Sequence, residues 1–282
     1  MTLPDGRELA WLDLGDPDGP VVFAFHGTPG SRNQIGFLEE VITASGARVV
    51  IPDRPGYGHS TFHKGRRLSD WATDVACLAD HLGLNRFSVI GVSGGGPHAS
   101  ACARYLPDRV STLGIVSGVG PLNSSDAAEG MMRANKALTA LSRRSQYLVY
   151  PLIGLQTFVS RRWPEAAVRS LIKAVPESDA AIIGNPVYSA VFIEDAKRAS
   201  ATSAIAASQD FALFARDWGF RLEDIEVPTH VWHGDADRNV PFNHGQRQAD
   251  SIPGAEFHAC PGEGHFLVVE HFPEILRAVT TP

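Results

Sequence analysis

Ser93 is the first residue whose setting points to chemistry, because it stands in the pattern Gly-x-Ser-x-Gly at residues 91–95. The apolar run at 87–92 predicts a buried strand, and Pro97 suits the first turn of a following helix. Ser93 is thereby predicted to lie on a sharp strand-to-helix turn, where glycines let neighbouring segments approach closely. Such a turn presents a serine hydroxyl as a nucleophile.

A serine hydroxyl is a weak nucleophile near neutral pH and needs a base, which in turn needs a carboxylate to orient it. The sequence offers both groups after predicted strands. The strand predicted at 227–233 runs into Asp235 and Asp237, and the strand predicted at 256–260 runs into His265. Either aspartate is a candidate acid, and the order along the chain is serine, aspartate, histidine.

A hydrolytic site also needs backbone N–H groups that hold an oxyanion. An apolar strand predicted at 21–25 ends in the loop 26–30, whose composition leaves the backbone accessible. We predict that the N–H groups of Thr28 and Gly94 form the oxyanion hole.

These groups need a scaffold, and the order of predicted elements supplies one. Residues 7–25 are interpreted as a hairpin that leads into a buried strand. Ser69 is the expected N-cap of a helix that covers the sheet, and a closing helix is expected from Pro273. Strands alternating with helices predict an α/β fold with a mostly parallel sheet, helices on both faces and sites at the carboxyl ends of the strands. The strands are predicted at 21–25, 47–51, 87–92, 110–117, 227–233 and 256–260.

The alternation stops between about residues 121 and 217, where helical patterns alone occur. Phe211, Phe214 and Trp218 fall on one apolar helix face. We therefore predict a helical cap at 121–217, inserted into a core domain made of residues 1–120 and 218–282. Apolar helices need a surface to bury against, so the cap is expected to cover Ser93 and to decide substrate choice.

Composition and charge restrict the class of partner. The 282 residues are 44% hydrophobic and 20% charged, which is ordinary for a globular chain with one sizeable core. The formal net charge of −6 comes without basic blocks, so nucleic acid is disfavoured and a small molecule is expected. Three scattered cysteines predict neither a disulfide framework nor a zinc site and favour a reducing compartment. No apolar leader is evident, so the cytoplasm is the expected location, and no signal indicates an oligomeric state.

The most lipophilic stretch, residues 147–155, is too short to span a bilayer and contains Pro151 and Gly154. Arginines flank it at 143–144 and 161–162, so contact with a lipid surface is an alternative. We expect instead an apolar helix packed over a core or pocket, and no stable insertion into a membrane.

The remaining histidines and the loop at 53–60 are interpreted as structural. Asp53 and Arg54 are expected to brace the loop beneath the site, and neither they nor His59 are expected to be catalytic. No other histidine pairs with a carboxylate or cysteine at metal-ligand spacing along the chain, so neither a metal nor another cofactor is expected. Structural or surface roles are predicted for His26, His98, His230, His233 and His258.

Taken together, five motifs resemble the α/β-hydrolase fold superfamily, at residues 26–30, 53–60, 91–95, 234–237 and 264–265. The resemblance covers nearly the whole chain outside the predicted cap. It implies a triad of Ser93, Asp237 and His265, because in similar proteins the acid comes third after the glycine that ends the strand. The spacing of the Val-Pro pair at 240–241 also matches similar proteins, and Asp235 stays the alternative acid.

The resemblance implies a cofactor-independent serine hydrolase that cleaves a small carboxylic ester or related acyl compound through an acyl-enzyme. A serine at position 93 argues against dehalogenases and epoxide hydrolases, which carry aspartate there. Carbon–carbon bond hydrolases are an alternative, although they often have tryptophan where this chain has Phe266. Perhydrolase or haloperoxidase side activity is a further alternative within the same machinery.

A binding protein and a peptidase are also weighed against the ester hydrolase. A ligand receptor on a hydrolase fold would bind without turnover, but the retained serine, aspartate and histidine favour an enzyme. A proline-iminopeptidase-like aminopeptidase is suggested by the loop at 26–30, and it would need cap carboxylates to bind a substrate ammonium. The available carboxylates are Glu177, Asp179, Glu194 and Asp195.

Overall fold

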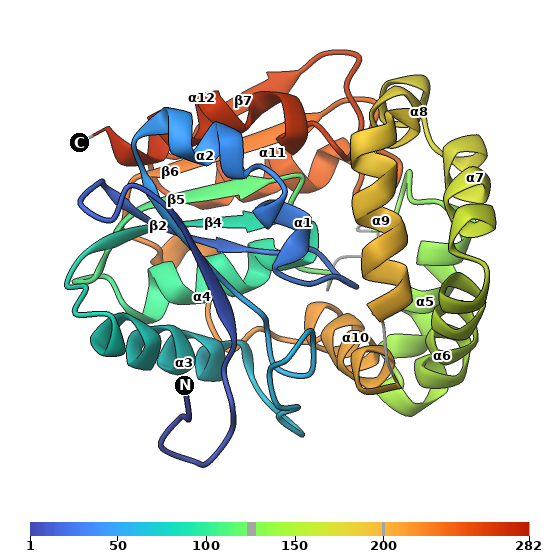
Figure 1. The fold of residues 1–282 in the computed structure, drawn as a ribbon, viewed down its shortest axis with the longest axis horizontal. Coiled ribbons are helices and arrows are strands. Elements are labelled where there is room, and N and C mark those ends of the chain that lie inside the picture. Colours follow the sequence, from blue (N-terminus) through green and yellow to red (C-terminus); the bar gives the residue numbers. More distant parts are fainter. Residues whose placement is uncertain (123–127, 199–200, 282) are drawn as a thin grey trace.

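A seven-stranded sheet forms the centre of the computed structural model, which describes residues 1–122, 128–198 and 201–281 (Figure 1). The strands are β1 (Trp11–Gly15), β2 (Val21–Phe25), β3 (Arg48–Pro52), β4 (Phe87–Val92), β5 (Val110–Val116), β6 (Thr229–Gly234) and β7 (Glu256–Cys260). They lie in the order β1-β3-β2-β4-β5-β6-β7, and all neighbours are parallel except β1 and β3. The predicted α/β class with a mostly parallel sheet is confirmed.

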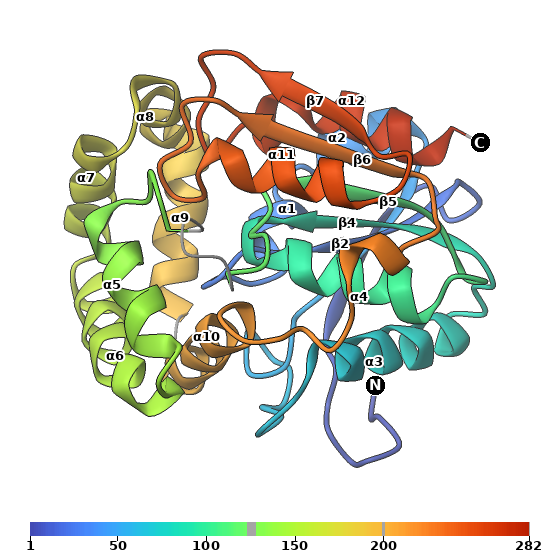
Figure 2. The same cartoon turned by 180° about the vertical axis from the view of Figure 1, so that it is seen from behind.

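Helices cover both faces of this sheet (Figures 1 and 2). The helices of the core are α1 (Asn33–Gly36), α2 (Glu39–Ser45), α3 (Leu68–His81), α4 (Gly96–Tyr105), α11 (Phe242–Ser251) and α12 (Val268–Thr280), with short 3-10 turns η1 (Ser93–Gly95) and η2 (Leu222–Asp224). α2 and α12 lie on one face, and α3, α4 and α11 lie on the other.

An apolar core forms on each face because successive strand residues point to opposite sides of a sheet. In β2, Phe23 and Phe25 pack toward α3, where the Trp71 ring lies 5.3 Å from that of Phe25. Val22 and Ala24 of the same strand pack toward α2 and α12. Each large buried side chain stabilises the fold by about 1.5–3 kcal/mol. The two cores therefore fix the sheet from which the site is built.

The predicted hairpin within residues 7–25 is wrong. β3 lies between β1 and β2, and Trp11 of β1 is paired with Pro52 of β3 in an antiparallel register. β2 is almost entirely buried, so it takes an interior position in the sheet. β1 is partly exposed along its length, which suits the edge.

Two predicted helix starts are also corrected. The Asp70 carboxylate accepts the Arg67 N–H at 2.8 Å at the start of α3, so Ser69 is not the N-cap. α12 begins ahead of Pro273, which lies inside the helix. Proline removes one helical hydrogen bond there. Burial of Phe272 and the rest of the apolar face offsets that loss, since most helix stability comes from packing.

Six further helices lie between β5 and η2 in the described part of the chain, and we call them the helical segment. They are α5 (Arg133–Ser142), α6 (Gln146–Arg162), α7 (Pro164–Ala174), α8 (Glu177–Gly184), α9 (Pro186–Arg198) and α10 (Ala201–Phe214). They gather beyond the carboxyl ends of the parallel strands (Figure 1). All six fall inside the predicted range 121–217, while the division into core and cap domains stays a prediction.

α6 presents an apolar face to solvent, so the expectation that its apolar residues pack over a core is wrong for most of them. Val149 and Ile153 are buried, in a cluster that includes Tyr57 and residues of α10. Leu155 and Phe158 are each 62% exposed. We define the outer face of α6 as Tyr147, Leu148, Leu152, Leu155, Phe158, Val159 and Trp163, all of them exposed. No helix among the described residues is both long enough and apolar enough to cross a bilayer.

Candidate active site

Ser93 lies on the tight turn between β4 and α4, as predicted. Its backbone φ is 54°, a left-handed conformation that residues other than glycine rarely adopt. A Cβ on Gly91 would lie 2.5 Å from the Gly95 carbonyl oxygen, and a Cβ on Gly95 would overlap the Phe25 carbonyl oxygen. These close approaches explain both glycines of the pattern.

The structure joins Ser93 to two of the predicted partners. The His265 Nε2 atom lies 3.0 Å from Ser93 Oγ, and His265 Nδ1 lies 2.7 Å from Asp237 Oδ2. Asp235 lies outside this chain of hydrogen bonds, and its Oδ1 accepts the Gly262 N–H at 2.7 Å. Of the two candidate aspartates, Asp237 is the one that contacts the histidine.

Asp237 is buried and held in its charged form. Its Oδ1 accepts the N–H groups of Asn239 at 2.8 Å and Val240 at 3.0 Å, which leaves Oδ2 for His265. Burial alone raises the pKa of the Asp237 carboxyl. The His265 and His233 side chains outweigh burial and hold that pKa well below its usual range.

His265 shows the opposite shift. Burial alone lowers the pKa of its imidazole, but the Asp237 charge, the hydrogen bond to Asp237 and the nearby Asp179 charge together raise that pKa above its ordinary value. A histidine with a raised pKa is a stronger base toward the Ser93 hydroxyl.

Asp179 of α8 holds the backbone of the loop that carries His265, which we call the histidine loop. Its Oδ2 accepts the His265 N–H at 3.0 Å, and its Oδ1 accepts the Phe266 N–H at 2.9 Å. A Cβ on Gly264 would overlap this carboxylate, which explains the glycine before the histidine. Burial raises the pKa of the Asp179 carboxyl, and the two N–H groups oppose that shift only in part. Sequence reasoning missed this role because Asp179 and His265 are 86 residues apart.

The two predicted oxyanion donors are adjacent. A Cβ on Gly94 would lie 3.1 Å from the Thr28 nitrogen, so glycine is what allows the two backbones to approach. The Thr28 hydroxyl accepts a hydrogen bond from Arg54 Nη2 at 2.7 Å and donates one to Asp210 Oδ2 at 3.0 Å. The Thr28 side chain is thus committed to the protein interior, and its backbone is what borders the site.

Asp210 of α10 is the centre of a fully buried ionic network beneath the loop at 26–30, which we call the oxyanion loop. Its Oδ2 lies 3.1 Å from Arg54 Nη1 and accepts the Tyr57 hydroxyl at 2.9 Å, while its Oδ1 pairs with Arg66. Arg54 also donates to the Gly94 carbonyl oxygen at 3.0 Å. Burial alone raises the pKa of Asp210, but the two guanidinium groups outweigh it and hold that pKa well below its usual range. Sequence reasoning missed Asp210, whose one signal was a single charged residue in an otherwise uncharged helix.

The loop residues expected to be structural occupy supporting positions. Asp53 accepts the N–H groups of Arg32 at 2.8 Å and His59 at 3.1 Å, which braces the loop as predicted. His98 is buried, and burial together with the Arg54 charge lowers its pKa to about 3. His98 is therefore a neutral member of the buried network and not a base at the site.

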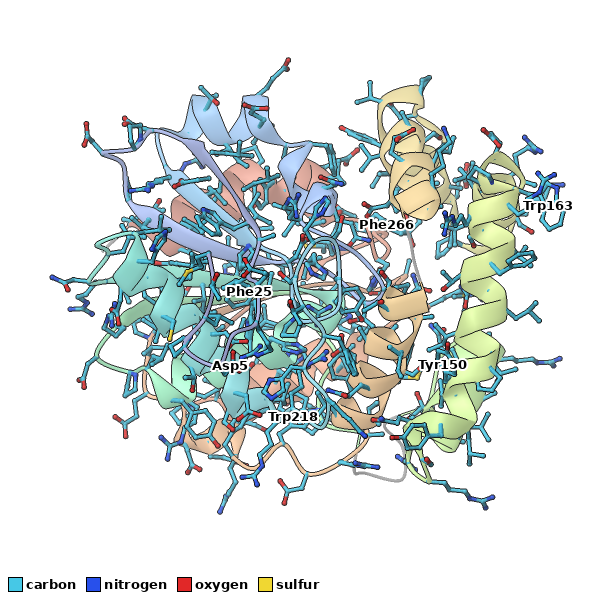
Figure 3. All side chains as sticks on the ribbon, turned by 60° about the horizontal axis from the view of Figure 1, so that its bottom comes forward. Asp5, Phe25, Tyr150, Trp163, Trp218 and Phe266 are labelled. Atoms are coloured by element: carbon cyan, nitrogen blue, oxygen red, sulfur yellow. The ribbon has the colours of Figure 1, made fainter. Side chains whose placement is uncertain are left out.

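A cavity of about 830 Å³ lies between the strand ends and the helical segment, within the usual size range of small-molecule sites. Ser93 and His265 line it from the core. Phe266 stands between the core and the helices (Figure 3), with its ring 5.3 Å from that of Phe192 in α9. From the helical segment, Leu138, Ile153, Phe192, Phe211 and Phe214 supply apolar wall.

Comparisons with known proteins agree with this architecture. Residues 20–151 match the family model of the α/β-hydrolase fold. A bifunctional esterase/perhydrolase of Acinetobacter calcoaceticus is 28% identical over 269 residues, which cover 94% of this chain and 92% of that protein. A 2-hydroxy-6-oxo-6-phenylhexa-2,4-dienoate hydrolase of Burkholderia cepacia is 29% identical over 261 residues, covering 90% and 84% of the two chains.

Solved structures of α/β-hydrolase fold proteins are also similar to this chain. An α/β-hydrolase fold protein from Nakamurella multipartita is 28% identical, with a TM-score of 0.71 over 99% of this chain and 96% of the other. A thermophilic esterase from Thermogutta terrifontis is 25% identical, with a TM-score of 0.71 over 99% and 97% of the two chains. The strand order, the turn that carries Ser93 and these matches show that the chain has the α/β-hydrolase fold and is similar to members of that superfamily.

Proposed function

We propose that this protein is a cofactor-independent serine hydrolase that cleaves a small carboxylic ester or related acyl compound through an acyl-enzyme. The observation that carries the proposal is the hydrogen-bonded chain from Ser93 through His265 to Asp237, with distances of 3.0 and 2.7 Å. Similarity to an esterase/perhydrolase and to an esterase of known structure supports the same reaction class.

The first half-reaction forms the acyl-enzyme. Ser93 Oγ attacks the ester carbonyl carbon while His265 Nε2 takes the hydroxyl proton, and the charged Asp237 stabilises the imidazolium that results. The N–H groups of Thr28 and Gly94 stabilise the oxyanion of the tetrahedral intermediate. The intermediate collapses when the C–O bond to the alcohol breaks and His265 returns its proton to the leaving oxygen.

The second half-reaction releases the acid. Water attacks the acyl carbonyl carbon and gives its proton to His265, and the same two N–H groups hold the second oxyanion. The bond to Ser93 Oγ then breaks, the proton moves from His265 to Ser93, and the free enzyme is restored. His265 must be neutral to begin either step, so the rate is expected to fall as pH falls through its raised pKa.

In this proposal the helical segment is a cap domain at 121–217 over a core of residues 1–120 and 218–282. Its support is the cavity, which α5, α6, α9 and α10 line opposite Ser93. All proposed catalytic groups come from the core. The cap therefore selects among acyl groups, through a wall in which apolar side chains lie beside Arg161, Asp195 and Lys197.

A carbon–carbon bond hydrolase is the second candidate, because a relative at 29% identity is a 2-hydroxy-6-oxo-6-phenylhexa-2,4-dienoate hydrolase. An aminopeptidase is less favoured. Of the four acidic residues considered for binding an ammonium, Asp179 is engaged by two backbone N–H groups and Glu194 lies 3.0 Å from Lys197. Asp195 lines the cavity, where it accepts the Ser31 hydroxyl at 2.7 Å.

The direct test is Ser93→Ala assayed on nitrophenyl esters of increasing acyl length, with aminoacyl anilides and a dienoate ketone as competing substrate classes. We expect the variant to fold and to lose at least about 10⁴-fold in turnover on the preferred ester. A folded variant with near wild-type turnover would remove Ser93 from the mechanism. A preference for anilides or for the ketone would replace the ester assignment.

The identity of the acid is tested with a matched pair of variants. Asp237→Asn is expected to lower turnover by about 10³-fold or more, because His265 loses its orienting carboxylate. Asp235→Asn, two positions away and outside the hydrogen-bonded chain, is expected to have a mild effect. Reversed effects would make Asp235 the acid.

A further inference from the structure

Three metal-ligating side chains that the proposed hydrolysis does not use meet on the last two strands of the sheet. His230 of β6 is paired in register with Glu256 of β7, and His258 lies two residues further along β7 on the same face. Chain spacing gave no sign of this cluster, because His230 and its partner across the sheet are 26 positions apart in the chain. Strand pairing alone brings the three together.

Their separations fit one metal ion. His230 Nδ1 lies 3.1 Å from His258 Nε2 and 3.4 Å from Glu256 Oε2, and His258 Nε2 lies 4.0 Å from Glu256 Oε2. Tetrahedral Zn²⁺ with bonds of about 2.0–2.1 Å separates its ligand atoms by about 3.4 Å. The observed distances lie on both sides of that value, so small side-chain adjustments suffice.

The surroundings restrain the histidine rings and leave the cluster accessible to an ion from solvent. The Trp232 indole stacks on the His258 ring at 4.6 Å with an interplanar angle of 11°, and Trp232 Nε1 donates to Glu274 at 3.1 Å. The side chains of His230 and His258 are partly buried, whereas that of Glu256 is exposed. An ion can therefore enter from solvent, and water can fill the fourth position.

We propose that His230, Glu256 and His258 bind one Zn²⁺ or a similar divalent transition metal ion. Two imidazoles and one carboxylate form a ligand set that suits such ions. His230 and Glu256 stand near the starts of β6 and β7, whereas Ser93 and its partners follow the carboxyl ends of their strands. The site is thus structural: it ties the edge strand β7 to β6 and takes no part in hydrolysis.

The test is calorimetric titration of the full chain, carrying no histidine tag, with Zn²⁺. We expect one ion per chain and a higher midpoint of thermal unfolding with Zn²⁺. Glu256→Gln and His258→Gln should each weaken Zn²⁺ binding by at least about 10-fold. Loss of a residue that only supports a metal ligand already lowers metal affinity by about that factor. Glu256 is exposed, so its variant is not expected to disturb the fold.

The matched control is His81→Gln, which removes an exposed histidine that also lies beside a tryptophan, with its ring 5.7 Å from that of Trp11. It should leave Zn²⁺ affinity unchanged. Cu²⁺ in place of Zn²⁺ should quench part of the tryptophan fluorescence through Trp232, and Glu256→Gln should weaken that quenching. Affinity equal in the wild type and in both ligand variants would mean adventitious binding only and would overturn the proposal.

The outer face of α6 carries a second, independent inference. A run of large exposed apolar side chains along one helix marks an interaction surface, and this one bears Tyr147 and Trp163 near its two ends. In Figure 3, Trp163 projects from the end of α6 away from the sheet. Aromatic side chains at the ends of an apolar stretch are typical of segments that contact lipid headgroups.

We propose that this face binds the surface of a membrane that contains anionic lipid. Residues 143–173 hold six basic residues and one acidic residue, although the whole chain has a formal charge of −6. Arg144 precedes α6 and Arg161 and Arg162 end it; all three are exposed, and Arg161 also lines the cavity. Two copies of the chain docked through this face would bring like charges together, whereas anionic headgroups would neutralise them. The charge pattern therefore favours a lipid surface over a second copy.

Sedimentation with phosphatidylcholine vesicles, with and without phosphatidylglycerol, tests this surface. We expect binding to the mixed vesicles that decreases with added salt and is lost in Phe158→Glu. The matched control is Val187→Glu, an exposed apolar residue of α9, which should bind as the wild type does. Failure to bind the mixed vesicles, or a dimer in solution that Phe158→Glu dissociates, would overturn the proposal.

Discussion

Asp179 and Asp210 both reach from the helical segment into the core, but they are held there by opposite physical means. Asp179 accepts two neutral backbone N–H groups of the histidine loop, and burial raises its pKa. Asp210 lies among the charges of Arg54 and Arg66 beneath the oxyanion loop, and its pKa is depressed. The helical segment is therefore tied to one side of the site by dipoles and to the other by paired charges. The two contacts should differ in strength and respond in opposite directions to pH.

The largest expected effect comes from Asp210→Asn. This change leaves two guanidinium groups buried without their counter-charge, so the free energy of unfolding should fall by about 3–5 kcal/mol. Urea unfolding measures it. Asp224→Asn is the control, because Asp224 is a half-exposed partner of Arg104 at 3.9 Å and should cost at most about 1 kcal/mol. Equal costs for the two variants would mean that the buried network contributes no more than a surface pair.

Asp179→Asn should have a smaller effect on stability and a clear one on pH dependence. The asparagine amide keeps one acceptor oxygen but turns its NH₂ group toward a backbone N–H. The free energy of unfolding should therefore fall by about 1–3 kcal/mol. Removal of the Asp179 charge lowers the pKa of His265, so the acidic limb of kcat/KM should move to lower pH. Glu177→Gln, on the exposed start of the same helix, should change neither. An unmoved limb would show that Asp179 does not act through the histidine.

The pH dependence of stability should separate the two carboxylates by sign. The folded pKa of Asp210 is depressed, so its contribution is present above its unfolded pKa of about 3.9 and is lost as pH falls below that value. The folded pKa of Asp179 is raised, so its contribution is full below about 3.9 and declines as pH rises through the folded value. For each asparagine variant, the unfolding free energy of the wild type minus that of the variant is plotted against pH between about pH 3 and pH 6. The two plots should have slopes of opposite sign. Slopes of the same sign would contradict the contrast.

The smallest expected effect concerns substrate choice. Phe211 follows Asp210 in α10 and lines the cavity, so Phe211→Ala should change the relative kcat/KM of short and long acyl esters by about 1 kcal/mol without abolishing turnover. Phe158→Ala, on the outer face of α6, should leave the ratio unchanged. An unchanged ratio in Phe211→Ala would argue against a cap that selects acyl groups.

Much of the fold was predictable because its signals are local. Apolar strands with turn residues at their ends predicted the parallel sheet, and the tight turn at Ser93 followed from glycines whose Cβ atoms would overlap the backbone. The errors arose where neighbours in space differ from neighbours in sequence. β3 rather than β2 pairs with β1, and packing of α12 tolerates Pro273 inside the helix.

The sequence by itself determined which loops carry the serine, the histidine and the aspartates, since each follows the end of a predicted strand and parallel strands bring such loops to one edge. Only the tertiary structure decided that Asp237 and not Asp235 contacts His265. The tertiary structure alone also assigned Asp179 and Asp210 to the two sides of the site, and brought His230, Glu256 and His258 together. The physical reason is that a carboxylate acquires its role from the donors and charges packed around it, and those come from segments far away along the chain.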